Sequence, residues 1–263
     1  MSGHSKWAKI KRQKGVKDAK RGNLFTKLAK NITLAAKEGG GDISMNFTLR
    51  LAVDKAKVAN MPSDNIARAI DRGSGKGADA IVYHRISYEA LGPAGTSLVI
   101  DCQTDNTNRT VADIKNIIET GGGKFASTGS VSWQFTEKGL IIIELTKIVP
   151  SGQFGKGEEK MAIELDEAIM EVMEIEGVED INDITWDTGE DTKNALEIVT
   201  KKENFSSVLK SIEGLAYGVL SAELVKIPNE KVSVNDVETE DRIAKFVESI
   251  EEHDDVDSVW VNM

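Results

Sequence analysis

Apolar residues in the first quarter of the chain recur at i, i+3 and i+4, the spacing of an amphipathic helix. One stretch predicts a helix over residues 23–38, with an apolar face of Leu24, Phe25, Leu28, Ile32, Ala35 and Ala36. The glycines at 39–41 end it. A second helix is predicted over 46–59, and a third follows Pro62 and runs to Gly73. Together these segments predict a small helical bundle.

After a glycine-rich linker at 73–77, apolar and polar positions alternate, as they do in strands. The pattern predicts strands over 82–91, 96–103 and 129–135 and a helix over 110–120. Thr110 and Asp113 have a spacing similar to that of a capping box, so we expect this helix to begin at Thr110.

The next segment has its own complete pattern of strands and helices. We predict strands over 139–146, 178–186, 195–200 and 219–227 and helices over 161–175 and 203–213. That order is βαββαβ, the ferredoxin-like arrangement. A helix over 239–252 and a strand over 257–261 remain, which is too little for a separate domain.

We therefore predict an α+β multidomain protein. Its parts are a basic arm with a three-helix domain (1–73), an α+β middle domain (79–136 plus 228–263) and an inserted ferredoxin-like domain (137–227).

Composition changes this picture mainly through charge. The chain has 263 residues and a net charge of −10, but residues 1–80 hold 17 Lys and Arg against 7 Asp and Glu. The first 30 residues hold 10 basic side chains and one acid. A basic head on an acidic body favours a polyanionic partner such as nucleic acid. Cys102 is the sole cysteine, which excludes an internal disulfide framework, and no apolar run reaches the length of a membrane helix.

The basic head supplies most of the candidate nucleic-acid-binding residues. They are Lys6, Trp7, Lys9, Lys11, Arg12, Lys14, Lys17, Lys20 and Arg21, followed by Lys27 on the first helix. Lysine and arginine neutralise phosphates, and an exposed tryptophan can stack on a base. Two alternatives are a solvating tail with Trp7 docked on the bundle, and an organelle transit peptide.

A polar run at a strand-to-helix junction, residues 104–110, is the second candidate. Helix capping accounts for Asp105, Asn106, Asn108 and Thr110. Arg109 is not needed as a cap, so we expect it to contact a partner or to form an inter-domain ion pair.

Motifs typical of enzymes are weak. Residues 121–124 (GGGK) lack the spacing and the Ser or Thr of a phosphate loop, and a helix stop explains them better. Residues 183–189 match a calcium loop poorly, and 251–255 (EEHDD) favour a solvated acidic helix end over a metal site. His4, His84 and His253 are far apart in sequence. We expect no catalytic residues, no cofactor, no metal and no small-molecule substrate.

Several short motifs resemble one family closely. They are residues 1–11 (MSGHSKWAKIK), 18–22 (DAKRG), 25–28 (FTKL), 35–40 (AAKEGG), 60–62 (NMP) and 104–110 (TDNTNRT). These segments look like the YebC/PmpR family, which includes the mitochondrial translational activator of cytochrome c oxidase. The resemblance implies three domains, the third inserted in the second. It also implies a cytoplasmic, non-enzymatic regulator of gene expression.

Two functions therefore stay open, and a third is disfavoured. The first is a DNA-binding transcriptional regulator, as family members are commonly described. The second is a translation factor that contacts ribosomal RNA, which is favoured by the lack of a basic recognition helix within 46–73. An enzyme with a site between domains is disfavoured because no nucleophile, base and orienting group stand out.

Overall fold

The computed structural model describes residues 18–75, 83–150, 158–187, 192–234 and 236–263. These residues form two compact units. One is the continuous segment Glu137–Ile227, and the other combines the preceding residues with Pro228–Met263. The fold is mixed α and β, with a helical N-terminal region followed by two sheets, as the sequence predicted.

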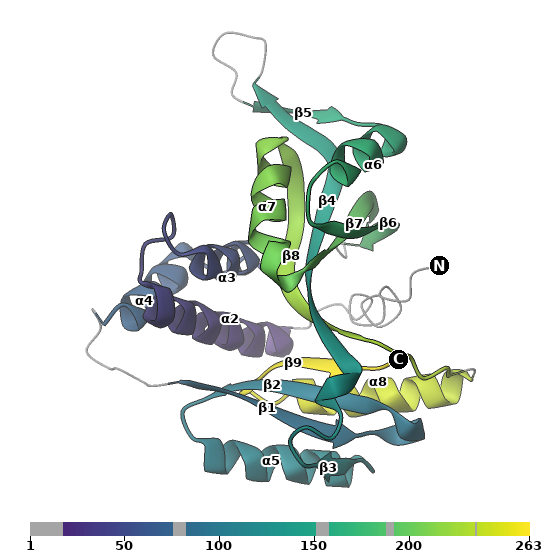
Figure 1. The fold of residues 1–263 in the computed structure, drawn as a ribbon. Helices are drawn as coiled ribbons and strands as arrows, with labels where there is room; N and C mark the ends of the chain where they lie inside the picture. The colour runs from purple at the N-terminus through teal and green to yellow at the C-terminus, as the bar shows by residue number, and fades with distance from the viewer. Residues whose placement is uncertain (1–17, 76–82, 151–157, 188–191, 235) are drawn as a thin grey trace. The chain divides into compact units, whose positions relative to one another are not determined.

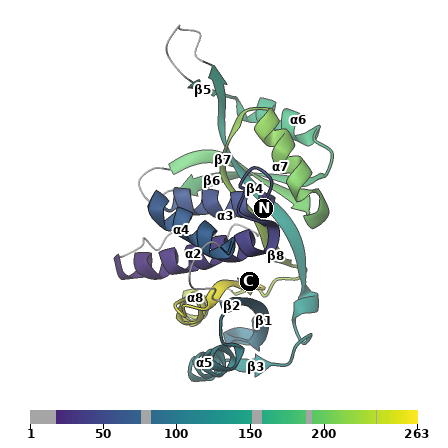
Figure 2. The same cartoon turned by 90° about the vertical axis from the view of Figure 1, so that its left-hand side faces the viewer.

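Three helices make up the N-terminal region: α2 (Asp18–Gly39), α3 (Phe47–Val58) and α4 (Ser63–Gly73). They lie side by side in both views of the ribbon (Figures 1 and 2). Their buried faces share one core, comprising Leu28, Ile32, Ala35, Ala36, Leu49, Val53, Ala56, Met61, Ile66 and Ala69. The periodicity predicted this core correctly, although α2 begins five residues earlier than expected.

The turn between α2 and α3 depends on one asparagine. Asn46 caps α3, because its Oδ1 accepts from the backbone N–H of Leu49 at 3.0 Å. Its Nδ2 also donates to the carbonyl oxygens of Ala35 at 2.8 Å and Gly40 at 2.7 Å. Gly40 has φ +86, which glycine adopts without strain. A side chain on Gly39 would overlap Asn46, so the glycine run both ends α2 and leaves room for this cap.

The same unit holds a four-stranded antiparallel sheet, in the order β3-β1-β2-β9. Its strands are β1 (His84–Leu91), β2 (Ser97–Thr104), β3 (Lys124–Ala126) and β9 (Val256–Val261). Helices α5 (Thr107–Thr120) and α8 (Val237–Glu251) pack on each other beside this sheet (Figure 1). The C-terminal strand thus pairs with β2, more than 150 residues earlier in the chain.

One predicted strand, at 129–135, is wrong. The buried carboxylate of Glu89 accepts hydrogen bonds from the backbone N–H groups of Gly129 and Val131, both at 2.6 Å, and of Ser132 at 3.1 Å. These N–H groups are therefore not available for a sheet ladder, and the segment ends in a 3-10 turn at Ser132–Gln134.

The unit Glu137–Ile227 has the predicted βαββαβ order with one additional strand. Its elements are β4 (Phe135–Pro150), β5 (Glu158–Ala162), α6 (Leu165–Met173), β6 (Val178–Asp187), β7 (Thr192–Lys201), α7 (Phe205–Gly214) and β8 (Tyr217–Pro228). The sheet order is β5-β4-β7-β6, and β8 also pairs with β4. The additional strand is β5, which pairs with the end of β4, so the helix predicted from residue 161 begins at Leu165.

Candidate nucleic-acid interface

Most of the predicted nucleic-acid-binding residues lie outside the described part of the chain. This holds for Lys6, Trp7, Lys9, Lys11, Arg12, Lys14 and Lys17. Lys20 and Arg21 belong to the start of α2, but their side chains are not described. Lys27 and Arg109 are described, and both lie around a single turn at residues 251–257. The role of all these residues in binding stays a prediction.

Lys27 contacts the end of helix α8. Its Nζ donates to the carbonyl oxygen of Glu251, the last residue of α8, at 2.5 Å. The C-terminus of a helix carries unsatisfied carbonyl groups and a partial negative charge, which an ammonium group stabilises. The structure therefore gives Lys27 an internal partner.

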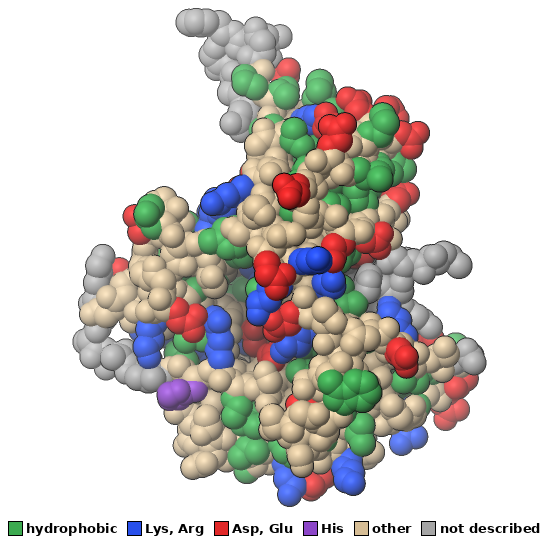
Figure 3. Space-filling model, in the orientation of Figure 1, with side chains coloured by type: hydrophobic (Ala, Val, Ile, Leu, Met, Phe, Trp, Pro, Cys, Tyr) green, Lys and Arg blue, Asp and Glu red, His purple; other side chains and the backbone are tan. Residues whose placement is uncertain are grey.

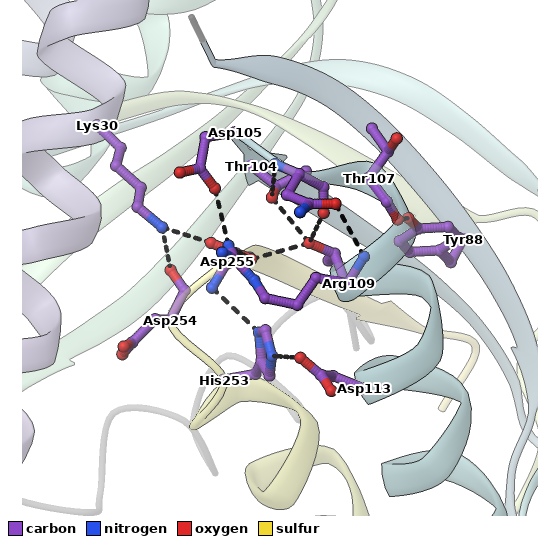
Figure 4. Close-up of polar contacts among 12 residues, drawn as sticks. Lys30, Tyr88, Thr104, Asp105, Thr107, Arg109, Asp113, His253, Asp254 and Asp255 are labelled. Atoms are coloured by element: carbon purple, nitrogen blue, oxygen red, sulfur yellow. Dashed lines mark hydrogen bonds and ion pairs between the residues drawn. The ribbon is translucent and has the colours of Figure 1, made fainter. Parts of the chain in front are cut away.

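Two further residues on the same face of α2 contact this turn. Lys30 Nζ lies 2.7 Å from Asp255 Oδ1 and donates to the carbonyl oxygen of Asp254 at 3.0 Å (Figure 4). Asn31 Nδ2 donates to Asp257 Oδ1 at 2.7 Å. The spacing i, i+3, i+4 places Lys27, Lys30 and Asn31 side by side on a helix. This polar face attaches α2 to the segment between α8 and β9.

Asp255 is the centre of these contacts (Figure 4). Its side chain is 5% exposed. Besides Lys30, it receives Arg109 Nη2 at 2.9 Å and the hydroxyl of Thr110 at 2.8 Å. Burial alone would raise the pKa of Asp255, but the hydrogen bonds from these three side chains hold that pKa well below its ordinary value. The carboxylate is thus ionised throughout the physiological range, and it joins α2 to the start of α5.

Arg109 forms ion pairs, but not the inter-domain ion pair expected for it, because Asp105 and Asp255 belong to the same predicted domain as Arg109. It contacts Asp105 at 2.8 Å as well as Asp255, while half of its side chain stays exposed. Asp255 belongs to the same sheet-containing part as Arg109, and Lys30 is the cation that the helical region contributes.

Helix α5 begins three residues earlier than the sequence suggested, so the predicted capping box of Thr110 and Asp113 is wrong. The cap is Asn106, whose Oδ1 accepts from the backbone N–H of Arg109 at 3.1 Å. Thr110 lies one turn inside the helix, where its hydroxyl donates to Asp255 and its oxygen lies 2.8 Å from Thr104 Oγ1, whose hydroxyl is then the donor of that pair. Capping therefore explains Asn106. The buried Thr110 instead binds Asp255, and the buried Thr104 binds Thr110.

The acidic run 251–255 is only in part the solvated helix end that its composition favoured, because Glu252 and Asp254 are exposed and the remaining residues are not. Asp255 is buried, and His253 is largely buried with its ring 3.5 Å from Asp113 Oδ2. Among the described residues, no three His, Cys, Asp or Glu side chains gather closely enough to hold a metal ion. The glycines at 121–123 end α5, and side chains at Gly121 and Gly123 would collide with the ring of Phe246.

Two family models match the chain. The model described as the TACO1/YebC protein N-terminal domain matches residues 5–76, and the TACO1/YebC second and third domain matches 83–263. The chain belongs to the TACO1/YebC family. The boundary between the two matches falls in the glycine-rich linker that separates the helical region from β1.

Relatives in this family are similar over their whole length. "Probable transcriptional regulatory protein" of Halothermothrix orenii is 40% identical, with 100% of this chain and 94% of the relative covered. "Probable transcriptional regulatory protein BG0025" of Borrelia garinii subsp. bavariensis is 43% identical, with 100% and 97% covered. The crystal structure of a conserved hypothetical protein from Aquifex aeolicus has a TM-score of 0.77 at 31% identity, covering 97% of this chain and 95% of that one.

Sequence reasoning missed Asp255 and Lys30. The i, i+3, i+4 spacing of Lys27, Lys30 and Asn31 is a signal for a shared polar face, but it does not name the opposite partner. Asp255 stands in an acidic run without a local signal for burial, since its partners lie 145 residues and more away in the sequence. In the described residues, no helix combines the length and the apolar character that a membrane span requires.

Proposed function

We propose that this protein is a non-enzymatic, nucleic-acid-binding regulator of gene expression that acts in the cytoplasm, and that its principal target is DNA in transcriptional control. The observation that carries the proposal is the concentration of 10 basic side chains against one acid in the first 30 residues of a chain with net charge −10. The names of the relatives, which describe transcriptional regulatory proteins, support the same function.

The physical basis is the release of counterions from a polyanion. Each lysine or arginine that neutralises a phosphate releases condensed cations, so affinity rises steeply as salt is lowered. The basic arm is covalently joined to α2, and Lys27, Lys30 and Asn31 attach α2 to the turn at 251–257. The arm is therefore linked to a fixed helix, which supports its use as a tethered binding element.

The shifted carboxylates of the described residues have structural explanations. Asp255 joins α2 to α5, and Glu144 joins three strands through Lys160 and Lys193. Each of these carboxylates is held ionised by two cationic side chains in a structural ion-pair network, which supports a non-enzymatic function.

A second candidate is a translation factor that binds RNA or the ribosome. A helix-turn-helix protein reads bases with the N-terminal residues of its recognition helix. Helix α4 follows the turn at 59–62 and would be the recognition helix of such a pair. Its first turn carries Asp64, and the arginines Arg68 and Arg72 come later. A carboxylate at that position would be repelled by duplex phosphates, which favours binding through the arm to RNA.

Crosslinking in cells, followed by sequencing of the bound nucleic acid, tests the proposal and separates the two candidates. The DNA regulator predicts recovery of DNA fragments that depend on residues 2–21. The translation factor predicts recovery of ribosomal RNA and co-sedimentation with ribosomes. Recovery of neither above the level of a variant lacking residues 2–21 would overturn both.

A further inference from the structure

We propose that a pocket between α2 and α4 binds one nucleotide of a single-stranded nucleic acid, a second contact beyond the basic arm. The pocket has a volume of about 310 Å³ and is lined by residues of both helices, by Met61 and by Tyr83 just before β1. Ligand pockets begin near ~300 Å³, so this volume suits a single nucleotide unit. The proposal rests on the proposed function and adds to it the place and the chemistry of a contact.

All the described charged residues that line the pocket are basic. Its lining includes Lys30, Arg68 and Arg72, and none of the described residues that line it is Asp or Glu. Lys30 is already paired with Asp255, which leaves the two arginines as the phosphate-binding groups.

The two arginines are prepared for an anion. They stand at i and i+4 on the exposed face of α4, so their guanidinium groups lie on the same side of the helix. Arg68 donates only within its own helix, to the side-chain oxygen of Asn65 and the carbonyl oxygen of Asp64. Within the described part of the chain, neither Arg68 nor Arg72 forms an ion pair with a carboxylate. Guanidinium groups bind phosphate through paired hydrogen bonds.

The pocket lining also contains apolar and aromatic residues. Phe25 of α2, Met61 and Tyr83 contribute to it. Lys30 Nζ lies 5.8 Å from the centre of the Tyr83 ring, within cation–π distance. An aromatic ring stacks on any base, and such a stack is sequence-tolerant. Guanidinium groups and rings in one pocket match the phosphate and the base of one nucleotide.

A single strand fits this pocket and a duplex does not. A base must leave its neighbours to enter a pocket of this size, and in a duplex unstacking has a cost that an unpaired strand avoids. The basic arm leads along the chain into α2, and the pocket begins at Phe25, seven residues after the helix starts. A strand held by the arm can therefore reach the pocket.

The test measures binding of the full chain to a fluorescently labelled oligouridylate, with salt titrations. The double variant Arg68→Gln/Arg72→Gln should weaken binding about tenfold and lower the salt slope, by ~0.7 for each lost single-strand phosphate contact. The control Lys37→Gln/Lys57→Gln removes the same number of positive charges from the neighbouring helices α2 and α3, outside the pocket, and should change affinity less than about twofold. Arg68→Lys/Arg72→Lys should restore most of the slope. A variant enters the comparison only if its melting temperature equals that of the wild-type chain.

The aromatic side is tested with Tyr83→Phe and Tyr83→Ala. Keeping the ring should keep affinity, and removing it should weaken oligouridylate binding about tenfold without a change in slope. With 4-thiouridine in the strand, ultraviolet crosslinks should fall on peptides that contain Phe25, Met61 or Tyr83.

Three results overturn the proposal. Equal losses for the arginine variant and its control would assign the effect to general charge. Crosslinks confined to residues 1–21 would restrict binding to the arm. Adenosine 5′-monophosphate binding at micromolar concentration, with displacement of the strand, would assign the pocket to a free nucleotide. A wild-type chain that binds neither oligouridylate nor duplex DNA refutes the proposed function itself, whereas oligouridylate binding that Arg68 and Arg72 do not affect refutes only the pocket.

Discussion

The helical N-terminal region and the unit Glu137–Ile227 differ in how their basic side chains are used. Residues 1–75 hold 16 Lys and Arg against 6 Asp and Glu, whereas residues 137–227 hold 9 against 20. In the latter unit, lysines are matched with glutamates: Lys138–Glu179, Lys147–Glu171, Lys202–Glu137, and Lys160 and Lys193 with Glu144. Acidic side chains gather over the region of α6 in Figure 3.

This difference shows that composition alone does not identify a binding surface. A cation that is paired inside the protein has no charge left for a partner. Lys27 and Lys30 are basic residues of the helical region, yet they bind α8 and Asp255. Arg68 and Arg72 in the same region have no carboxylate partner among the described residues. The comparison therefore supports the proposal that the arm and α4, rather than the acidic unit Glu137–Ile227, bind a polyanion.

The largest expected effect is obtained by separating the two regions. A fragment of residues 137–227 should fold cooperatively, because it contains its own sheet and helices, and it should not bind nucleic acid. A fragment of residues 80–137 should not fold, because α8 and β9 are missing from it. Dispersed nuclear magnetic resonance spectra and a thermal transition check both. A cooperatively folded 80–137 would contradict the inserted arrangement.

The next effect concerns Asp255, the buried carboxylate that forms an ion pair with Lys30. Asp255→Ala leaves Lys30 and Arg109 without their shared partner and should lower the free energy of unfolding by about 3 kcal/mol. The neighbouring Asp254→Ala is the control, since that side chain is exposed, and it should change stability by less than about 0.5 kcal/mol. Urea unfolding measures both. Equal losses would mean that Asp255 does not join α2 to α5.

A smaller effect is expected at the paired lysines of the other unit. Glu144 receives Lys160 and Lys193, both at 2.8 Å, and their hydrogen bonds lower its pKa from 4.5 to about 2. Because Lys160 is more than half exposed, Glu144→Gln should cost only about 1 kcal/mol at neutral pH.

The pH dependence gives a sharper check on Glu144. A folded pKa below the unfolded value means that the carboxylate stabilises the fold above pH 4.5 and loses this contribution as the pH falls toward 2. The stability difference between wild type and Glu144→Gln should therefore vanish over that window. Glu159→Gln, an exposed position on β5, should show no such trend. A difference that is constant from pH 7 to pH 2 would contradict the assignment.

The smallest effects separate charge from stacking within the arm. Lys9→Ala should flatten the dependence of log affinity on log salt by about one unit and weaken binding to all nucleic acids alike. Trp7→Ala should leave the slope unchanged, because stacking releases no counterions, and should weaken single strands or RNA loops more than a duplex. Equal losses of affinity for duplex DNA, single-stranded DNA and structured RNA, with a changed salt slope, would mean that Trp7 only anchors the arm to the helical bundle.

The sequence predicted most elements because their periodicity is local. The core of α2, α3 and α4, the strands β1 and β2 and the βαββαβ order all follow from patterns within single segments. The failures share one cause. The predicted strand at 129–135 is replaced by turns because Glu89, 40 residues earlier, binds its N–H groups. Asp255 and β5 likewise depend on partners that no local pattern shows.

The candidate site was only partly predictable for the same reason. Arg109 was expected to contact a partner or to form an inter-domain ion pair, whereas it pairs within its own domain, and its partner Asp255 could not be identified from the residues around it. The pocket between α2 and α4 brings Phe25, Arg68 and Tyr83 together from three segments, and their spacing in the sequence carries no common period. Such juxtapositions come from packing.

The central claim is that the basic arm carries the affinity for nucleic acid, and one salt titration tests it most directly. Binding of the full chain and of a variant lacking residues 2–21 is measured on duplex DNA, single-stranded DNA and structured RNA. A variant lacking residues 2–5 is the control, since that segment contains no lysine or arginine. We expect a steep salt dependence for the full chain and the control, and loss of binding for the longer deletion with an unchanged melting transition. Unchanged affinity after removal of residues 2–21, in a protein that still melts cooperatively, would contradict the account.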